Sequence, residues 1–328
     1  MASAYQAARQ QAASIDRSDR GRLVVSGKDR ASYLQGLLSN DIVALTAGTG
    51  CYATYLTAQG RMISDLWVYE LGDVIMLNMP SIATRNTVLA KLDQFIFSED
   101  VQLGDVTDVF AQIAVVGPDA PRVVGALLGD SVERLAALPE HGCLRGEIAG
   151  GSAIVTRVTD TGEPGFDVYV ERDRLNAFKE ALAAAGVIEA DSATADVLRV
   201  EAGVPVFHRD MDEETIPLEA GIESRAISLT KGCYVGQEVI IRVLHRGHGR
   251  VAKKLVGLTI EGDAVPADGS LVRSGEKEIG EITSSVRSVA LDRPIALAYL
   301  QRDFLEPGTA VSIDGVPAVV ASLPFVPA

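Results

Sequence analysis

One thiol placed between glycines and charged residues is the strongest chemical feature of this sequence. It is Cys233, in the stretch Lys231-Gly232-Cys233-Tyr234-Val235-Gly236-Gln237-Glu238. Glycine allows positive φ or a close backbone approach, so we expect the thiol to lie on a bend. The β-branched run after Gly236 favours a strand, but a short helix also fits, and the pattern leaves both open.

The surroundings of Cys233 allow two opposite interpretations. If a helix follows, the thiol lies before its positive end and Lys231 adds a charge, and both would favour the reactive thiolate. A lone cysteine can equally be an inert residue buried in a turn. Gln237 and Glu238 could fix the loop through backbone hydrogen bonds or serve the site directly.

Composition excludes several classes of function. The chain has 328 residues and a formal net charge of −14, from 30 basic and 44 acidic residues. A general nucleic-acid binder needs a basic surface, so we expect no nucleic-acid partner. The three cysteines are far apart and include no Cys-x-x-Cys pair, which indicates neither a disulfide framework nor a zinc site.

The ends and the hydropathy of the chain bear on its location. The first 14 residues carry no apolar segment of the kind found in a secretory signal, and no stretch approaches eighteen uninterrupted apolar residues. We therefore expect a cytoplasmic protein without a membrane partner, and a monomer.

The first third of the chain alternates strand and helix patterns. A strand is expected at 22–26, a helix at 31–38 with Asp29 as its N-cap, and a three-stranded meander between 51 and 79. Ser81 then has the side chain and position of a helix N-cap. These residues predict an α+β module.

The strand–turn–helix pattern recurs later with a constant offset. Gly27 and Gly117, Asp29 and Asp119, and Leu37 and Leu127 are each 90 positions apart, as 117 − 27, 119 − 29 and 127 − 37 show. A recurrence at fixed spacing predicts two α+β modules of similar build. The second module continues with strands at 143–148, 153–158 and 166–170 and a helix at 173–185.

The last part of the chain has a different texture. A helix is expected at 192–201, and from residue 255 short β-rich pieces alternate with Gly, Pro and Asp turns. This pattern predicts a small antiparallel barrel or sandwich. We place the domains at 1–108, completed by 191–245, then 109–190, and then 246–328.

The eight-residue stretch resembles the signature of the folate-binding YgfZ proteins, which are relatives of the glycine cleavage T protein. Lys231, Gly232, Cys233, Tyr234, Gly236, Gln237 and Glu238 all match it, and the residues from Arg242 to Gly247 resemble its continuation. Four further blocks resemble the two families in the same order: Gln59–Asp65, Thr161–Asp167, Arg199–Pro205 and Ile216–Gly221. The resemblance implies an α+β fold, a three-domain clover leaf in which two α+β modules and a C-terminal antiparallel β-barrel surround a cavity.

The resemblance also implies a cofactor, tetrahydrofolate or a folate derivative, and residues that would bind it. Asp65 falls on the reactive aspartate of the T protein, Glu163 on its pterin-binding carboxylate, Tyr52 on a folate-contacting tyrosine and Arg199 on a folate-contacting arginine. A carboxylate can accept two hydrogen bonds from pterin, and arginine matches a carboxylate. The alternatives are plain: Glu163 could be surface, Tyr52 could only pack, and Arg199 could pair with Glu201 or the acidic run 210–214.

Two departures from the T protein bear on function. Ser64-Asp65 stands where the T protein has two aspartates, and Gly60-Arg61 where it has two glycines. With the cysteine signature, these favour the YgfZ interpretation: a tetrahydrofolate-binding factor for assembly or repair of four-iron clusters, in which Cys233 and Lys231 would act on iron–sulfur client or carrier proteins. The alternatives are a folate-dependent aminomethyltransferase, methyltransferase or demethylase using Asp65, and a folate sensor without catalysis.

A basic cluster follows the signature in this acidic chain. It comprises Arg242, His245, Arg246, His248, Arg250, Lys253 and Lys254. Such a patch could dock an acidic partner or the folate glutamyl tail, or it could be a solvated linker. Two histidines three residues apart are weak evidence for a metal site, and we predict none.

Overall fold

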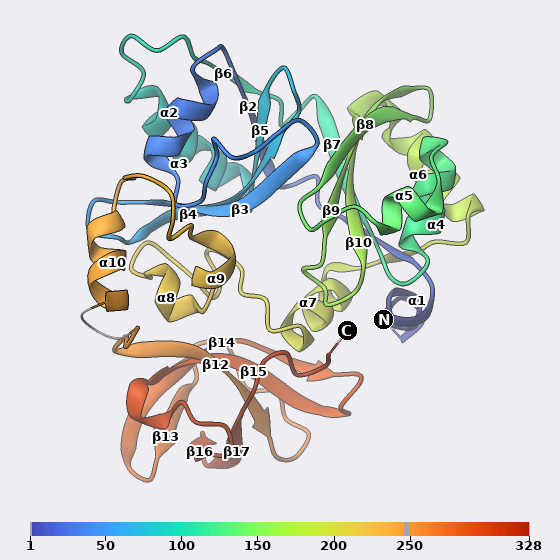
Figure 1. The fold of residues 1–328 in the computed structure, drawn as a ribbon. Coiled ribbons are helices and arrows are strands. Elements are labelled where there is room, and N and C mark those ends of the chain that lie inside the picture. Colours follow the sequence, from blue (N-terminus) through green and yellow to red (C-terminus); the bar gives the residue numbers. More distant parts are fainter. Residues whose placement is uncertain (1, 246–248, 328) are drawn as a thin grey trace.

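The computed structural model describes residues 2–245 and 249–327, and it shows three parts around a central region (Figure 1). A five-stranded sheet and a six-stranded sheet stand side by side, and a closed six-stranded barrel lies below them. The α+β clover leaf expected from the sequence is therefore confirmed.

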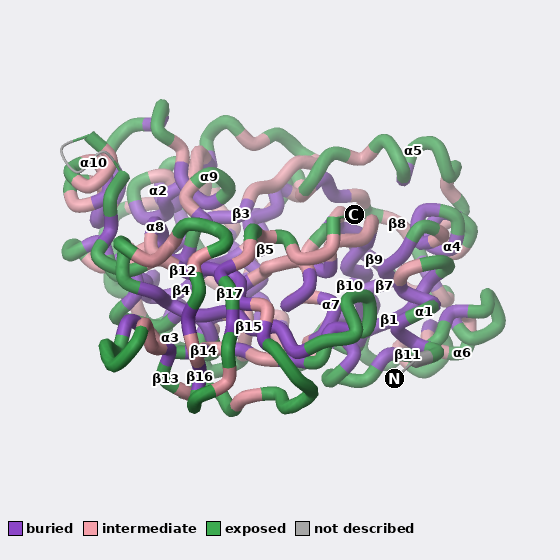
Figure 2. The backbone as a smooth tube through the Cα atoms, turned by 90° about the horizontal axis from the view of Figure 1, so that it is seen from below, coloured by how far each residue is buried: buried purple, intermediate pink, exposed green. Residues whose placement is uncertain are grey.

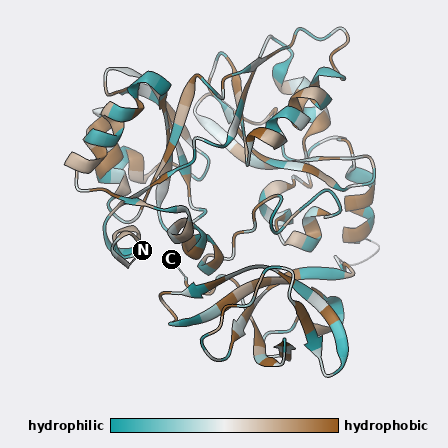
Figure 3. Cartoon of the chain, turned by 180° about the vertical axis from the view of Figure 1, so that it is seen from behind, coloured by the Kyte–Doolittle hydropathy of each residue, from teal (hydrophilic) through white to brown (hydrophobic). Residues whose placement is uncertain are grey.

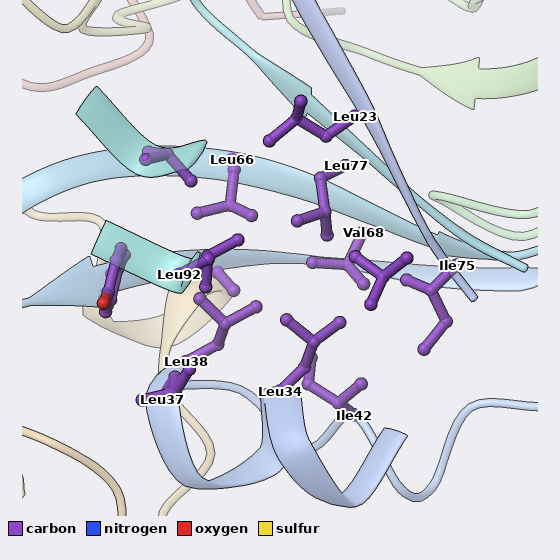
Figure 4. Close-up of a cluster of buried hydrophobic side chains, with 14 of the residues drawn as sticks. Leu23, Leu34, Leu37, Leu38, Ile42, Leu66, Val68, Ile75, Leu77 and Leu92 are labelled. Atoms are coloured by element: carbon purple, nitrogen blue, oxygen red, sulfur yellow. The ribbon is translucent and has the colours of Figure 1, made fainter. Parts of the chain in front are cut away.

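The five-stranded sheet has the order β3-β4-β5-β2-β6 with antiparallel neighbours. Helices α2 and α3 pack on it and enclose leucine, isoleucine and valine side chains (Figure 4). Ser81 accepts a hydrogen bond from the Thr84 amide as the N-cap of α3, whereas Asp29 makes no such cap and accepts from the Asp100 amide instead. The elements are β2 (Gly21–Ser26), α2 (Arg30–Leu37), β3 (Thr49–Leu56), β4 (Met62–Glu70), β5 (Ile75–Met79), α3 (Ile82–Asp93) and β6 (Gln102–Asp105).

The six-stranded sheet has the order β11-β1-β7-β10-β9-β8 and forms its own core with the helices beside it. Its elements after β6 are β7 (Phe110–Val116), α4 (Ala120–Leu128), α5 (Val132–Ala136), β8 (Cys143–Ile148), β9 (Gly151–Val158), β10 (Gly165–Glu171), the 3₁₀ turn η1 (Arg172–Arg174), α6 (Leu175–Ala184) and β11 (Ile188–Ala190).

The expected repeat has a physical basis in its two glycines. Gly27 has φ 98° and Gly117 has φ 123°, and each follows the first strand of its repeat unit. A Cβ on Gly27 would lie 2.0 Å from the Asp100 carbonyl oxygen, and one on Gly117 would lie 2.5 Å from that of Gln11. Only glycine fits either turn.

The N-terminal segment belongs with the second sheet, although residues 1–108 were grouped together from the sequence. Helix α1 (Ala2–Gln10) leads into β1 (Ala13–Asp16), which pairs with β7 and β11. Neither element was expected. The chain thus starts beside the second sheet and crosses to the first at β2.

Four helices follow the second sheet and lie between the sheets and the barrel (Figure 1). The segment 237–245 is helical, so the strand favoured by its β-branched residues does not form. Ile240 is buried, and Val243 and Leu244 pack with it against the same apolar cluster, as residues three and four apart on a helix do. The four helices are α7 (Ser192–Glu201), α8 (Pro217–Ala220), α9 (Glu223–Ala226) and α10 (Gln237–His245).

The C-terminal barrel closes in the order β12-β15-β14-β13-β16-β17. Buried and exposed residues alternate along much of β14, and Figure 3 shows polar and apolar stretches along the same strands, as expected for strands with one face inward. The strands are β12 (Lys253–Ile260), β13 (Leu271–Ser274), β14 (Lys277–Ser288), β15 (Arg293–Gln301), β16 (Ala310–Ile313) and β17 (Val316–Ala321), with the 3₁₀ turn η2 (Arg302–Phe304) after β15.

Buried segments gather in the strands, and exposed ones in the connections and in helices such as α5 (Figure 2). Within the described residues, no helix has both the length and the apolar character that crossing a membrane requires.

Candidate functional site

A cavity of about 400 Å³ lies where the two sheets meet the segment from α7 to α9. Its walls include β3 and β4 of the first sheet, the segment 15–20 after α1, and the turns before β8 and after β9. The described residues that line it include none from the barrel strands. This volume is in the range that holds a small organic ligand.

Asp65 brings a buried carboxyl group to this cavity. Its Oδ2 accepts a hydrogen bond from the Tyr52 hydroxyl at 2.6 Å, and its Oδ1 is buried with no hydrogen-bond partner in the described chain. Burial raises the pKa of Asp65, although the bond from Tyr52 opposes the shift. Asp65 and Tyr52 therefore lie together at the cavity, and Asp65 Oδ1 has no partner among the described residues. Their folate-binding roles stay predictions.

Two aromatic rings and two guanidinium groups surround this pair. The rings of Tyr52 and Trp67 are 5.5 Å apart and tilted by 49°. Arg225 lies over Tyr52 at 5.1 Å, and Arg20 lies over Trp67 at 4.7 Å. Arg225 makes no ion pair with any described residue. It is therefore a cation available to a ligand, and the sequence had not indicated it.

A buried charge cluster, which includes Arg20, also lies at this cavity. Arg17 contacts Asp160 at 2.8 Å and Asp167 at 2.9 Å, and Arg20 approaches both aspartates at 3.5 and 3.6 Å. Burial opposes the ionisation of Asp160, but Arg17 and Arg20 outweigh it and lower its pKa. These charges satisfy one another and hold the segment 15–20 against the second sheet.

Glu163 does not line the cavity. Its Oε1 accepts from Arg9 at 2.7 Å, and Arg9 also contacts the buried Glu201 at 2.5 Å. Glu201 in turn accepts from the Tyr5 and Ser288 hydroxyl groups. The cluster joins α1, the turn before β10, α7 and the barrel. The pterin-binding role of Glu163 stays a prediction, and it would require the carboxylate to leave Arg9.

Arg199 lines the cavity, but its guanidinium is engaged by the protein. It donates to Asp196 at 2.6 Å, to Asp210 at 2.8 Å and to the Ser284 hydroxyl at 2.7 Å. Its acidic partners are thus Asp196 and Asp210 of the acidic run, and not Glu201. This geometry counts against a role as folate contact and gives Arg199 the task of joining α7 to the barrel.

Lys231 is the structural anchor of the cysteine stretch. Its Nζ donates to the carbonyl oxygens of Gln35 and Leu38 at 2.6 Å and of Asn40 at 2.8 Å, at the C-terminal end of α2. Burial lowers the pKa of Lys231 to about 8, and the three acceptors favour its ammonium form at neutral pH. No ammonium hydrogen is left for Cys233, so its expected support of the thiolate stays a prediction that this geometry counts against.

The two glycines of the stretch differ. Gly236 has φ 85°, and a Cβ there would lie 2.5 Å from the Thr57 carbonyl oxygen and 3.3 Å from Gly60 of the β3–β4 turn. It therefore braces the hairpin that carries Asp65. Gly232 has neither a positive φ nor a described atom within 4 Å of its Cβ position. A positive φ is therefore wrong for this glycine, and a close approach to a ligand stays a prediction.

The remaining motif residues separate into buried and exposed ones. Tyr234 packs in the same apolar cluster as Tyr52, whereas Cys233 is exposed, so the inert buried cysteine is excluded. Gln237 and Glu238 begin α10, and their side chains make no hydrogen bond to a described residue. The predicted functional roles of Cys233, Gln237 and Glu238 stay predictions.

The basic cluster is only partly described. Arg246 and His248 lie outside the described residues, and His245 ends α10. Lys254 approaches Glu223 at 3.6 Å, and Lys253 lies over the Tyr299 ring. In the described ranges, no three His, Cys, Asp or Glu side chains are grouped to hold a metal ion.

Two family models match nearly the whole chain. Residues 1–231 match the GCVT N-terminal domain, and residues 253–327 match the glycine cleavage T-protein C-terminal barrel domain. The chain belongs to the glycine cleavage T-protein family. The second match covers the closed barrel described above.

Several relatives that are similar to almost the whole chain are aminomethyltransferases. An aminomethyltransferase from Rubrobacter xylanophilus is 34% identical over 98% of this chain and 85% of the relative. One from Streptomyces coelicolor is 32% identical over 97% of this chain and 87% of the relative. The crystal structure of the glycine cleavage system aminomethyltransferase T from Bartonella henselae has a TM-score of 0.88 at 23% identity, over 99% of this chain and 89% of that one, and shows the same fold.

Proposed function

We propose that this protein is a tetrahydrofolate-dependent one-carbon transferase of the aminomethyltransferase type. Members of its family bind tetrahydrofolate, in agreement with the cofactor expected from the sequence. The relatives named above support this function, which was the alternative in the sequence analysis, better than a role in iron–sulfur cluster assembly.

The observation that carries the proposal is the carboxyl group of Asp65. Burial raises the pKa of Asp65, so this carboxyl group holds a proton more readily than an exposed aspartate, which favours proton exchange with a ligand. Tyr52 holds one oxygen of this group and leaves Oδ1 for the ligand. Its place on the cavity wall and its raised pKa support a role for Asp65 as a general acid–base.

The cavity also fits a folate. The nitrogen of tetrahydrofolate that accepts the one-carbon group would supply the transfer chemistry. The flat pterin ring suits the aromatic rings of Tyr52 and Trp67. The unpaired guanidinium of Arg225 suits an acidic tail. Orphaned Oδ1 of Asp65 matches a ring or amino N–H.

Titration calorimetry with tetrahydrofolate, followed by an assay with an aminomethylated lipoyl carrier, tests the proposal. Wild-type protein should bind and turn over, and Asp65→Asn should lower kcat by roughly a hundredfold or more, as loss of general acid–base catalysis does. Asp314→Asn, in an exposed barrel turn, is the matched control and should leave kcat unchanged. Equal turnover by Asp65→Asn and wild type would contradict the role of Asp65.

A second function, assembly or repair of four-iron clusters by a YgfZ-type protein, is favoured by one observation. The Cys233 thiol is exposed within the stretch that resembles the YgfZ signature, so a partner protein can reach it. In cells lacking the native gene, Cys233→Ser should then fail to restore four-iron enzyme activities. Full restoration by Cys233→Ser would exclude this second function.

A further inference from the structure

His141 is a strained residue on the wall of the same cavity. It lies in the turn between α5 and β8 with φ 62°, a region that few residues other than glycine adopt. Its amide donates to the Arg157 carbonyl at 3.2 Å, and the Gly142 amide donates to that of Pro139 at 2.8 Å. Strained backbone of this kind persists where the surroundings fix it, and it is frequent at functional sites.

The first sheet holds this turn from the other side. The Cys143 amide donates to the Gly48 carbonyl at 2.9 Å. A Cβ on Gly50 would lie 2.7 Å from the His141 carbonyl oxygen, so only glycine allows this contact. His141 is thus clamped between the two sheets, beside the cavity that both of them line.

The imidazole of His141 has no hydrogen-bond partner among the described residues. Its side chain is 17% exposed, and its Nδ1 is buried without a hydrogen bond, 3.9 Å from Glu140 Oε1. Burial, and then the charge of Arg225, lower the pKa of His141 to about 4, while Asp160 opposes the shift. The ring is therefore neutral at physiological pH, and one of its nitrogens is an acceptor.

Two charged groups that line the cavity with His141 are already engaged. Asp160 is held by Arg17 and Arg20, and Arg199 by Asp196 and Asp210. No described residue donates a hydrogen bond to the neutral His141 ring. A buried polar atom without a partner costs free energy, and a ligand N–H that pairs with it removes that cost.

We propose that His141 is a ligand-binding residue of the cavity, whose neutral imidazole accepts a hydrogen bond from a ligand N–H. The N–H belongs either to the bound tetrahydrofolate or to the amine of the aminomethyl donor. This inference rests on the proposed function and adds a residue to its site.

The test compares His141→Gly, His141→Asn and His208→Gly with wild type. His141→Gly should raise either the Kd for tetrahydrofolate or the KM for the aminomethylated carrier by roughly three- to thirtyfold, the worth of one hydrogen bond to a buried group. A change in Kd places the N–H on folate, and a change in KM alone places it on the donor. His141→Asn should stay within about threefold of wild type, because asparagine accepts positive φ and keeps an acceptor oxygen near the ring position.

His208 is the matched control because it has φ 67° but does not line the cavity. His208→Gly removes an imidazole from the same backbone conformation, so it should bind and turn over like wild type. If wild type binds tetrahydrofolate and His141→Gly keeps both Kd and KM within twofold, the inference about His141 is wrong. Wild-type protein that binds no tetrahydrofolate overturns the proposed function, and this inference with it.

Discussion

The cavity and the cysteine stretch are built in opposite ways. The cavity gathers side chains from distant segments, and several of its polar atoms, such as Asp65 Oδ1 and His141 Nδ1, are left without partners. The stretch 231–238 is continuous in sequence, and its lysine has a full set of acceptors. Its thiol is exposed, as are Gly232 and Glu238.

This difference separates two kinds of sequence signal. Lys231 and Gly236 are fixed by local geometry, since one anchors the loop to α2 and the other lets it approach the hairpin of Asp65. Neither residue lines the cavity, and both contact elements next to it. A motif can therefore identify a family strongly while most of its residues serve the scaffold of a site that lies elsewhere.

Replacing the anchor should have the largest effect on stability. Lys231→Met leaves the carbonyls of Gln35, Leu38 and Asn40 without their donor, and we expect the free energy of unfolding to fall by about 3 kcal/mol. Chemical denaturation measures this loss. Lys28→Met, at an exposed position, is the control and should change stability by less than about 0.5 kcal/mol. A stable Lys231→Met protein whose Cys233 alkylates more slowly would instead make Lys231 an activator of the thiol.

The neutral imidazole of the cavity predicts a specific acid sensitivity. The pKa of His141 is about 4 in the folded chain and about 6.5 when unfolded, so between these values the unfolded chain binds more protons. The contribution of the neutral His141 ring to the free energy of unfolding is therefore fully present above pH 6.5 and is lost as the pH falls towards 4. Between pH 7 and pH 4.5 the free energy of unfolding of wild type should therefore fall by about 2 kcal/mol more than that of His141→Asn.

Denaturation curves of both proteins at pH 7 and pH 4.5 measure that difference. Groups near His141, namely Arg225, Asp160 and Glu140, are the same in both proteins, so their titration largely cancels. His208→Asn should follow wild type, because that ring is exposed beside Glu213. Parallel losses in wild type and His141→Asn would show that His141 is not held neutral.

The regular elements were predictable because their signals are local. Periodic apolar residues indicated α7 and the barrel strands, and paired glycines indicated the repeat. Helix α10 was harder, because Val239, Ile240 and Ile241 favour a strand and only the apolar cluster around Ile240 selects the helix.

The site was predictable only in part. Asp65 and Tyr52 lie diagonally on two adjacent strands, where Tyr52 pairs with Trp67 and Asp65 with Thr54, and both were found through the resemblance. Arg20, His141 and Arg225 come from three separate segments, and no spacing in the sequence links them. Tertiary packing alone brings them to one cavity, and it also gave Glu163 and Arg199 partners that the sequence did not indicate.

Two of the arginines that line the cavity, Arg225 and Arg199, should respond differently to truncation. Arg225→Met removes the unpaired cation, so we expect the Kd for tetrahydrofolate to rise about tenfold, the lower end for a charged hydrogen bond. A tetrahydropterin without the glutamyl tail should bind this variant and wild type equally. Arg122→Met, on the exposed face of α4, is the control. A Kd that changes in Arg199→Met but not in Arg225→Met, with unfolding unaffected, would restore Arg199 as the folate contact.

The smallest effect on the cavity should come from the thiol itself. Burial raises the pKa of Cys51 to about 12 and of Cys143 to about 11. Cys143 is buried and Cys51 is half-buried, so both should stay thiols at pH 8, and iodoacetamide should modify the exposed Cys233 alone. Mass spectrometry should find one adduct, and Cys233→Ser should show none. Because Cys233 is exposed and absent from the cavity wall, the Kd for tetrahydrofolate should remain within twofold after alkylation. A larger change would mean that the stretch and the cavity are coupled through the Gly236–Gly60 contact, and the separation of scaffold from site would fail at that point.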